Sequence, residues 1–314
     1  MKSIILKSYA KINLSIDVKG KRDDGYHEVE MVMQQIDLYD KVTVTWEARE
    51  EDCVGSKKEP VEIQIETNLS YLPVNEKNIA YKAAALMAET YLQGKRGIIG
   101  VKLEKHVPVS AGLAGGSANG AAVIHGLSKL WELHLPMKRL QALGTQLGAD
   151  VPFCIMGQGA LNKELGFSQE ENSGTCAIAR GIGEELEVIP GIKSWVLLVK
   201  PPISVSTAHV YGKLNIGQIE ARPDTVELVE GLKQRNYQKI TKNMMNVLEN
   251  VSLKEYPVIV YTKNNMQKTC KGKKILMSGS GPTLFTLYPT KAKGKSAYEK
   301  MKSQVRETYL VRSL

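Results

Sequence analysis

The sequence predicts an α+β protein built from two domains. Its 314 residues are more than one compact core usually takes and enough for two. Segments with strand periodicity alternate loosely with segments of helix periodicity, and several strands read as half-buried, which favours the α+β class. The boundary is expected near Val188, so the first domain covers residues 1–188 and the second covers residues 189–314.

The first domain is predicted to open with strands. From Ile12 to Val18, apolar residues alternate with Asn13, Ser15 and Asp17, as in a strand with one buried face. Further strands are expected over residues 4–6, 26–31, 40–47 and 61–65, and the charged segment 48–60 is expected to be a loop.

A helix and another strand come next. Ala80, Ala83 and Met87 recur at helical spacing. Either Asn75 or Asn78 can cap this helix, because an asparagine side chain accepts a hydrogen bond from the first helical turn. Residues 98–104 then read as a strand.

The most informative stretch runs from Pro108 to Asn119. It holds Gly112, Gly115 and Gly116, it follows a predicted strand, and it leads into an apolar run of helical period. Glycines allow the backbone to approach a ligand closely, and a helix start offers free N–H groups and the positive end of the helix dipole. The order strand, glycine loop and helix start predicts an anion site, most often for phosphate. A glycine-rich turn that only connects two elements is the alternative.

This loop differs from the common phosphate loops. It lacks the Lys-Ser or Lys-Thr of a Walker loop and the spacing of a dinucleotide fingerprint. Its pattern Pro-x-x-x-Gly-Leu-x-Gly-Gly-Ser resembles the phosphate loop of the superfamily of galactokinase, homoserine kinase, mevalonate kinase and phosphomevalonate kinase. The resemblance implies that ATP phosphates are held by Pro108, Gly112, Leu113, Ala114, Gly115, Gly116, Ser117 and Ala118.

Asp150 stands between a predicted helix and an apolar segment. Gly148 suits the end of the helix expected over residues 137–147, and Pro152 limits the freedom of the chain beyond it. From the residues alone, Asp150 is either a turn or cap residue or a functional acid. The polar segment 157–174 is expected to be a loop.

The second domain is predicted from fewer signals. Strands are expected over residues 194–199 and 308–311, with a glycine turn within 276–287 and a basic helix over 291–304, whereas the strand and turn expected over residues 177–185 still belong to the first domain. Between Thr207 and the glycine turn, the sequence is more helical and polar. The lysines of the basic helix occupy its polar positions, opposite Ala297, Met301 and Val305, and therefore predict a solvated helix face.

Composition narrows the class of protein. No apolar run reaches the ~18 residues of a membrane helix, and the N-terminal apolar segment is too short for a signal peptide, so a cytoplasmic protein is expected. The cysteines at positions 53, 154, 176 and 270 form no Cys-x-x-Cys pair and indicate neither a zinc cluster nor a disulfide framework. A net charge of +9 suits either nucleic acid or a polyanionic small substrate.

Three separated motifs then align with one branch of the kinase superfamily. They are Tyr9-Ala10-Lys11-Ile12-Asn13-Leu14, Gly25-Tyr26-His27-Glu28 and Leu147-Gly148-Ala149-Asp150-Val151-Pro152-Phe153. Together with the glycine loop they resemble the 4-diphosphocytidyl-2-C-methyl-D-erythritol kinase family. The resemblance covers most of the chain and is weakest over residues 212–270. It implies a first domain of the ribosomal-protein-S5-like fold that binds ATP and a ferredoxin-like second domain.

The resemblance implies a catalytic pair. Asp150 would take the proton from the 2-hydroxyl of the substrate as this oxygen attacks the γ-phosphorus of ATP, and Lys11 would hold Asp150 ionised. These roles agree with phosphoryl transfer, which depends on positioning and electrostatic stabilisation. Gly279, Ser280 and Gly281 match a third motif of the superfamily, which packs near the substrate and the catalytic lysine.

The resemblance also implies the binding residues and partners. The cytidyl diphosphate substrate would contact Asn13, Tyr26, His27, Thr207 and Tyr211, with His27 reading the cytosine and Tyr211 stacking on it. Asn78 and Lys105 would join the ATP site. Mg²⁺ is expected with ATP, its protein ligands are unknown, and a monomer or weak homodimer without nucleic acid or membrane partners is expected. Ala114 and Ala118 depart from the family pattern, which has a glycine and a serine there, and the 157–174 loop is longer than usual.

Three alternatives stay open at this point. A kinase of the mevalonate or homoserine type would share the glycine loop but would not need Tyr26 and His27. A basic RNA-binding protein would share the fold of the first domain but would not explain Lys11 with Asp150. An inactive relative is suggested by Ala118, which removes one hydroxyl from the phosphate cradle.

Overall fold

The computed structural model describes residues 1–49 and 61–314, so the loop predicted over residues 48–60 lies almost wholly outside the described residues. The chain packs into two compact units. Unit 1 contains residues 1–9, 39–107 and 115–174, and unit 2 contains residues 10–38, 108–114 and 175–314. The chain therefore passes between the units several times.

Two long strands belong partly to each unit. β1 (Lys2–Lys21) and β2 (His27–Arg49) are continuous, so the separate strands predicted within these ranges are parts of longer ones. Every residue of β1 from Ser8 to Val18 is buried. The prediction of a half-buried strand is therefore wrong, because both faces are covered and polar residues such as Asn13 and Asp17 lie in the interior.

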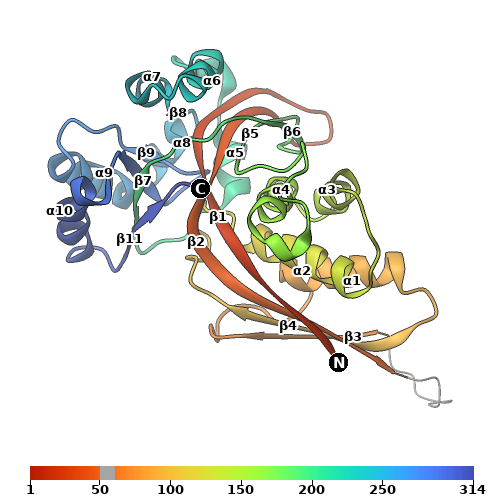
Figure 1. Ribbon diagram of the computed structural model, residues 1–314. Coiled ribbons are helices and arrows are strands. Elements are labelled where there is room, and N and C mark those ends of the chain that lie inside the picture. The colour runs from red at the N-terminus through yellow and green to blue at the C-terminus, as the bar shows by residue number, and fades with distance from the viewer. Residues whose placement is uncertain (50–60) are drawn as a thin grey trace. The chain divides into compact units, whose positions relative to one another are not determined.

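Unit 1 combines a sheet with a layer of helices. β3 (Val61–Thr67) runs parallel to β4 (Arg96–Glu104), which is antiparallel to the end of β2, with Val44 opposite Val101. On one side of β3 and β4 stand α1 (Ile79–Tyr91), α2 (Gly115–Leu130), α3 (Met137–Thr145) and α4 (Val151–Leu161) (Figure 1). α2 packs against α1 and α4, and its Val123, Ile124 and Leu127 are completely buried.

The segment after Asp150 differs from its prediction. α4 continues to Leu161 and a 3₁₀ turn, η1, covers Lys163–Leu165, so residues 157–161 are helical rather than part of a loop. Packing rather than a turn requires a glycine at position 159. A Cβ at Gly159 would come within 2.5 Å of the Met137 methyl carbon. Only the segment beyond η1 is irregular up to β5.

Unit 2 contains strands on both sides of the domain boundary expected from the sequence. β5 (Cys176–Arg180) is antiparallel to β2, with Val32 opposite Ile178, and also pairs with β6 (Glu185–Val188). β8 (Met245–Asn246) is parallel to β1, with Ser15 opposite Met245. A separate antiparallel sheet follows the order β11-β7-β10-β9. Its strands are β11 (Glu307–Arg312), β7 (Trp195–Lys200), β10 (Leu284–Tyr288) and β9 (Leu276–Met277).

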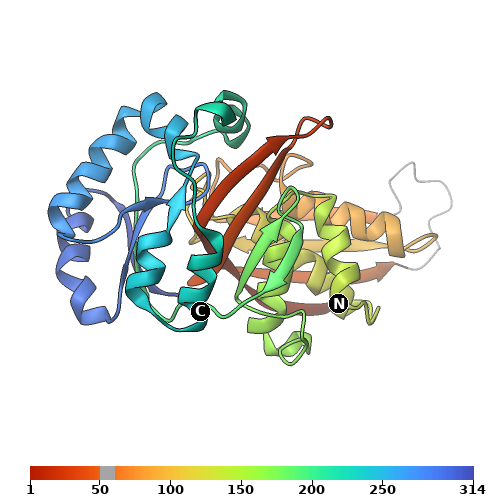
Figure 2. The same ribbon diagram turned by 90° about the horizontal axis from the view of Figure 1, so that it is seen from above.

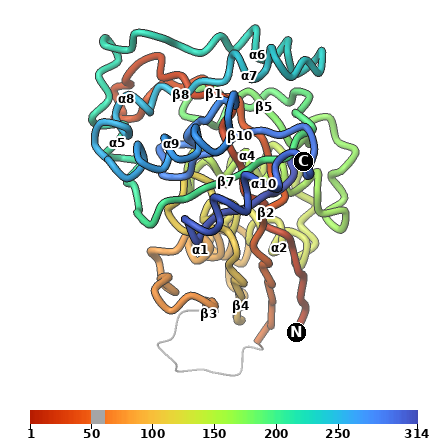
Figure 3. The backbone as a smooth tube through the Cα atoms, turned by 90° about the vertical axis from the view of Figure 1, so that its left-hand side faces the viewer, coloured from red at the N-terminus to blue at the C-terminus, as the bar shows by residue number. Residues whose placement is uncertain are grey.

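Helices cover this second sheet. α9 (Pro257–Thr269) and α10 (Lys291–Lys302) pack against it and appear as the blue helices in Figure 2. α6 (Thr225–Lys233) and α7 (Tyr237–Asn243) lie side by side (Figure 3). The remaining helices of unit 2 are α5 (Thr207–Lys213), η2 (Ile216–Gln218) and α8 (Glu249–Glu255). The basic helix is confirmed: Ala297 and Met301 of α10 are buried while its lysines are exposed.

A membrane-spanning helix is not found within residues 1–49 and 61–314, where no helix combines the necessary length and apolar character.

Candidate active site

The glycine-rich stretch is divided between the two units. Within this stretch, residues 108–114 belong to unit 2, and α2 of unit 1 begins at Gly115. Gly112 has a φ of +72°, and a Cβ there would lie 2.2 Å from the carbonyl oxygen of Ser278, so the position requires glycine. Ala114 has a φ of +56°, where a glycine would be unstrained. Residues 115–118 form the first turn of α2, whose N–H groups have no acceptors within the helix.

Lys105 lies in a buried polar network of unit 1. Its ammonium group pairs with the Asp40 carboxylate and donates to Asn119 Oδ1 at 2.8 Å. The Asn119 amide nitrogen donates to Asp40 Oδ2 at 2.9 Å and to the Ser8 hydroxyl at 3.0 Å. The side chains of Lys105 and Asp40 are 3% and 0% exposed. Burial lowers the pKa of Lys105, and the charge of Asp40 opposes that shift.

Asn78 caps a helix, which is one of the two possibilities predicted from the sequence. It is the N-cap of α1 and accepts a hydrogen bond from the Ala80 N–H at 3.0 Å. Its side-chain amide donates to the carbonyl of Pro73 at 2.7 Å, which fixes the loop in front of the helix. Of the two asparagines considered, Asn78 is therefore the cap.

In unit 2, Lys11 belongs to a network of amides. Its ammonium group donates to Asn13 Oδ1 at 2.7 Å, and the same oxygen accepts the N–H of Gly279 at 3.1 Å. The Asn246 amide donates to the carbonyls of Met277 and Gly279, each at 2.8 Å. The glycine turn at residues 278–281 is thus tied to the strand that carries Lys11, as the superfamily motif implied.

An aromatic pair lies beside a cavity of unit 2. The rings of His27 and Tyr211 have centroids 5.3 Å apart and are tilted by 45°. They line a cavity of about 430 Å³ together with Lys21 and the segment that follows Tyr211. Burial, with a smaller contribution from Lys21, lowers the pKa of His27 and so favours its neutral imidazole. Neutral imidazole offers one donor and one acceptor to a planar ligand.

Tyr26 and Thr207, two other predicted substrate residues, are both exposed. Tyr26 is 57% exposed. The Thr207 hydroxyl is 2.9 Å from the Ser280 hydroxyl, which joins the start of α5 to the glycine turn. Thr207 is therefore linked to the Lys11 network of the same unit.

Asp150 occupies the N-cap position of α4 in unit 1. Pro152 stands in the first turn of this helix and Gly148 precedes the cap. The Asp150 side chain does not cap the helix N–H groups. Its carboxylate lies at the positive end of the α4 dipole, where negative charge is favoured. The turn-residue and functional-acid interpretations are therefore compatible with one another.

The structure also adds residues that the sequence analysis did not single out. Asp40 and Asn119 complete the Lys105 network, Asn246 completes the Lys11 network, and the Ser278 hydroxyl donates to the Gly112 carbonyl at 2.9 Å. Asp40 is the first residue of an otherwise alternating strand, which was a weak signal. Among the described residues, no group of three or more His, Cys, Asp or Glu side chains is arranged to hold a metal ion.

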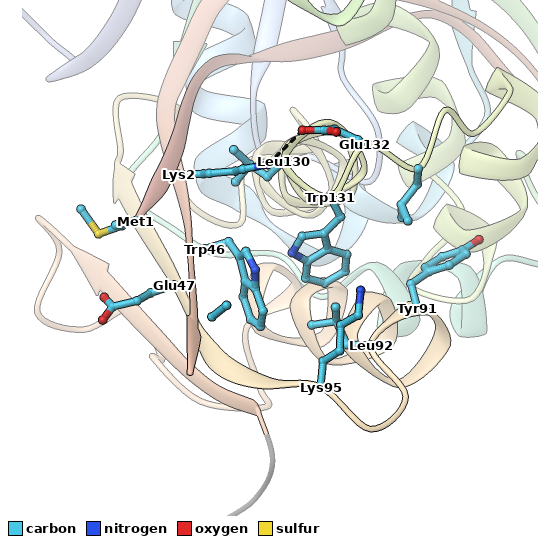
Figure 4. A pocket seen from close by; sticks show the side chains of 12 residues that line it. Met1, Lys2, Trp46, Glu47, Tyr91, Leu92, Lys95, Leu130, Trp131 and Glu132 are labelled. Atoms are coloured by element: carbon cyan, nitrogen blue, oxygen red, sulfur yellow. Dashed lines mark hydrogen bonds and ion pairs between the residues drawn. The ribbon is translucent and has the colours of Figure 1, made fainter. Parts of the chain in front are cut away.

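A further cavity of about 450 Å³ lies in unit 1, apart from the predicted site residues (Figure 4). Trp46 and Trp131 meet there edge to face, with ring centroids 5.6 Å apart. An ion pair between Lys2 and Glu132, 2.9 Å long, crosses it. None of the residues that line it belongs to the motifs of the sequence analysis.

Known families match both halves of the chain. The family described as GHMP kinases N terminal domain matches residues 78–158, and that described as GHMP kinases C terminal matches residues 228–307. The two matches lie on opposite sides of residue 188. The first includes the glycine loop and Asp150, and the second includes the glycine turn at residues 278–281.

Curated relatives are similar over the whole length. A protein of Alkaliphilus metalliredigens (strain QYMF), named 4-diphosphocytidyl-2-C-methyl-D-erythritol kinase, is 45% identical and covers 100% of this chain and 97% of its own length. A protein of the same name from Acetivibrio thermocellus is 41% identical, with 100% of each chain covered.

Solved structures agree in fold. A crystal structure of 4-(cytidine 5'-diphospho)-2C-methyl-D-erythritol kinase has a TM-score of 0.73 at 26% identity and covers 99% of each chain. A homoserine kinase from Cytophaga hutchinsonii has a TM-score of 0.70 at 19% identity, covering 100% of this chain and 95% of its own, which shows the shared fold alone. The predicted α+β two-domain kinase fold is confirmed.

Proposed function

The chain belongs to the GHMP kinases and, within them, to the 4-diphosphocytidyl-2-C-methyl-D-erythritol kinase family, and from this membership we propose that it transfers the γ-phosphoryl group of ATP to the 2-hydroxyl of 4-diphosphocytidyl-2-C-methyl-D-erythritol. This reaction is a step of the methylerythritol phosphate route to isoprenoid precursors. The observation that carries the proposal is the 45% identity over the complete chain. The His27–Tyr211 pair beside its cavity supports it, because a cytosine ring needs a stacking surface and a hydrogen-bonding partner.

The predicted catalytic pair and the predicted phosphate loop receive roles in this proposal. Asp150 is the base that takes the proton of the acceptor hydroxyl, and Lys11 offsets the charge that builds up on the phosphoryl group. The first turn of α2 and the loop before it hold the phosphates of ATP. The glycine at position 112 and the free N–H groups of α2 support this role, because both allow phosphate oxygens to approach the backbone.

Mg²⁺ is proposed as the companion of ATP. This ion keeps several waters and binds mainly through substrate phosphates with one or two carboxylates, so it does not need a cluster of protein ligands. When bound, the ion neutralises charge on the β- and γ-phosphates.

We also propose that the protein acts in the cytoplasm as a monomer or weak homodimer, without nucleic acid or membrane partners. The net charge of +9 then serves two polyphosphate ligands rather than a nucleic acid. Light scattering after size-exclusion chromatography measures the oligomeric state.

The test is ADP release by the purified protein with Mg-ATP and one of three alcohols. Release with 4-diphosphocytidyl-2-C-methyl-D-erythritol, and not with mevalonate or homoserine, is expected. Asp150→Asn should lower turnover at least ~100-fold while the Kd for ATP stays within about twofold, since loss of a general base affects the chemical step. Release with another alcohol alone would refute the proposed substrate, and full turnover by Asp150→Asn would refute the proposed base.

A further inference from the structure

The Lys105 network raises a question that the proposed function leaves open. Lys105 was expected to contact the phosphates of ATP, yet its ammonium group is almost completely buried against Asp40 and Asn119. A buried ammonium group is stable only when paired, because desolvation disfavours the charged form. The partners of Lys105 therefore decide whether a positive charge is present at this position.

The position lies directly beside the start of α2. A Cβ built on Gly115, the first residue of the helix, would stand 3.5 Å from the Lys105 nitrogen. Apart from the chain neighbours of Gly115 and the backbone of α2, the atoms nearer to that point belong to the Val107 side chain, which is apolar. Lys105 thus places a cation against the helix end that the proposed function assigns to phosphate, where the helix dipole alone supplies only a partial charge.

Asp40 satisfies several groups at once. Its Oδ1 accepts the backbone N–H groups of His106 at 2.7 Å and Val107 at 2.8 Å, which fixes the chain that leads into the glycine loop. Its Oδ2 accepts from Lys105 and from Asn119. One carboxylate therefore holds both the backbone before the loop and the ammonium group beside the helix.

Asn119 completes the arrangement because an amide has both a donor and an acceptor. Its oxygen accepts from Lys105 at 2.8 Å, and its nitrogen donates to Asp40 and to Ser8 of β1. Since Asn119 lies on α2, it ties the first turns of this helix to the ion pair. The polar atoms of the group are thereby matched donor to acceptor.

We propose that Asp40, supported by Asn119, is a positioning residue that holds the Lys105 ammonium group beside the first turn of α2, where its charge stabilises the phosphates of ATP. The inference rests on the proposed function in one respect, namely that ATP binds at this helix end. Asp40 itself need not touch ATP, and its effect on nucleotide affinity passes through Lys105.

Asp40→Asn tests this with little change in shape. The amide oxygen can still accept the N–H groups of His106 and Val107, so the loop stays anchored. The amide nitrogen then faces the Lys105 ammonium group and the Asn119 amide, which places donors against donors. The substitution therefore removes only the negative charge that pairs with the Lys105 ammonium group.

The experiment measures the Kd of Mg-ATP by calorimetry and the KM of both substrates in the folded variants. Asp40→Asn and Lys105→Met should each raise the Kd of ATP about tenfold or more, which corresponds to about 1.4 kcal/mol. The KM of the cytidyl substrate should change less than twofold. In the double variant the Kd should equal that of Lys105→Met, because Asp40 acts through Lys105.

Asp17→Asn is the matched control. Asp17 is as completely buried as Asp40 and is also held by cations, with Arg222 at 2.6 Å and Lys19 at 2.8 Å, but it lies in unit 2. The Asp17→Asn substitution should lower the free energy of unfolding and leave the Kd of ATP unchanged. An equal rise in the Kd of ATP in Asp17→Asn would overturn the proposal, because loss of any buried carboxylate would then suffice.

Other outcomes also test the positioning role of Asp40. An unchanged Kd in folded Asp40→Asn, an unchanged Kd in Lys105→Met, or effects that multiply in the double variant would each refute the positioning role. If Asp40→Asn alone fails to fold, Lys105→Met and the double variant still provide these comparisons. If the wild-type protein binds ATP without phosphorylating the cytidyl substrate, the proposed function fails while the test of Asp40 continues on ATP binding.

Discussion

Two buried networks of this protein solve the same problem with different chemistry. In unit 1, a carboxylate and an ammonium group, Asp40 and Lys105, are paired away from water. In unit 2, the ammonium group of Lys11 donates to a neutral amide, Asn13, which also holds the backbone of Gly279. Both networks fix a lysine next to a glycine-containing segment, but one does so with a countercharge and the other with an amide oxygen.

The difference teaches how each network can be broken. A charge pair in the interior depends on charge, so an isosteric exchange of Asp for Asn is enough to disturb it. A network of amides depends on a correctly placed acceptor, and therefore tolerates the reverse exchange better.

Asn13 gives the largest expected effect. Asn13→Ala removes the oxygen that accepts from both Lys11 and Gly279, one bond being to a charged group, and should lower the free energy of unfolding by about 3 kcal/mol. Asn13→Asp keeps an oxygen acceptor for both donors and should lose less than half as much. Urea unfolding at pH 7 measures both, and equal losses in the two variants would contradict the contrast.

His125 tests whether unit 1 contains a second charge-sensitive point. This histidine is buried, its Nε2 donates to the carbonyl of Ile155 at 2.9 Å, and burial lowers its pKa from 6.5 to about 4. The unfolded chain therefore binds a proton below pH 6.5 that the folded chain rejects until about pH 4. Stability should be greatest above pH 6.5 and should fall by about 2 kcal/mol between pH 7 and pH 5.

The control for this pH dependence is His125→Gln, which retains a donor for Ile155 but does not titrate. The difference in free energy of unfolding between the wild type and the variant should be constant above pH 7 and should shift by about 2 kcal/mol in favour of the variant between pH 7 and pH 5. Parallel curves from pH 7 to pH 5 would show that His125 is protonated in the folded protein as readily as in the unfolded one.

Features that depend on neighbouring residues were predictable from sequence, whereas features that depend on pairing between distant residues were not. Local chemistry determines the glycine loop, the cap at Asn78 and the basic helix α10, so the residues of each segment are enough to predict it. The Lys105 network was not predictable, because it joins Asp40 to Lys105 across 65 positions and to Asn119 across 79. Nothing in the neighbourhood of Asp40 distinguishes it from the other acids of the chain.

Burial was the other feature that sequence patterns missed. The alternation around Asn13 and Asp17 is typical of a strand with one face in solvent, yet both residues are fully buried. Asn13 and Asp17 are tolerated inside β1 because each has a partner far along the chain, Gly279 for Asn13 and Arg222 for Asp17. Such pairings depend on tertiary structure, which periodicity does not encode.

His27 and Asp40 are expected to act on different ligands, the cytidyl substrate and ATP. Asp40→Asn is expected to affect ATP, whereas His27→Ala should raise the KM of the cytidyl substrate about tenfold, or about 1.4 kcal/mol, and leave that of ATP within twofold. His209→Ala is the control, because His209 lies on the same helix as Tyr211 but is exposed and paired with Glu255 at 3.3 Å. Equal changes in both KM values would remove His27 from the cytosine site.

Ala114 gives the smallest expected effect, at the point where the chain passes from unit 2 to unit 1. Its φ of +56° costs an alanine about 1–2 kcal/mol relative to glycine. The greater freedom of glycine in the unfolded chain offsets about 0.4–1 kcal/mol of that cost. Ala114→Gly should therefore raise the free energy of unfolding by about 0.5 kcal/mol. Ala118→Gly, in the first turn of α2, should instead lower it by about 1 kcal/mol, because glycine disfavours the helix. Urea midpoints that shift in opposite directions would support the left-handed backbone at Ala114, and shifts of the same sign would contradict it.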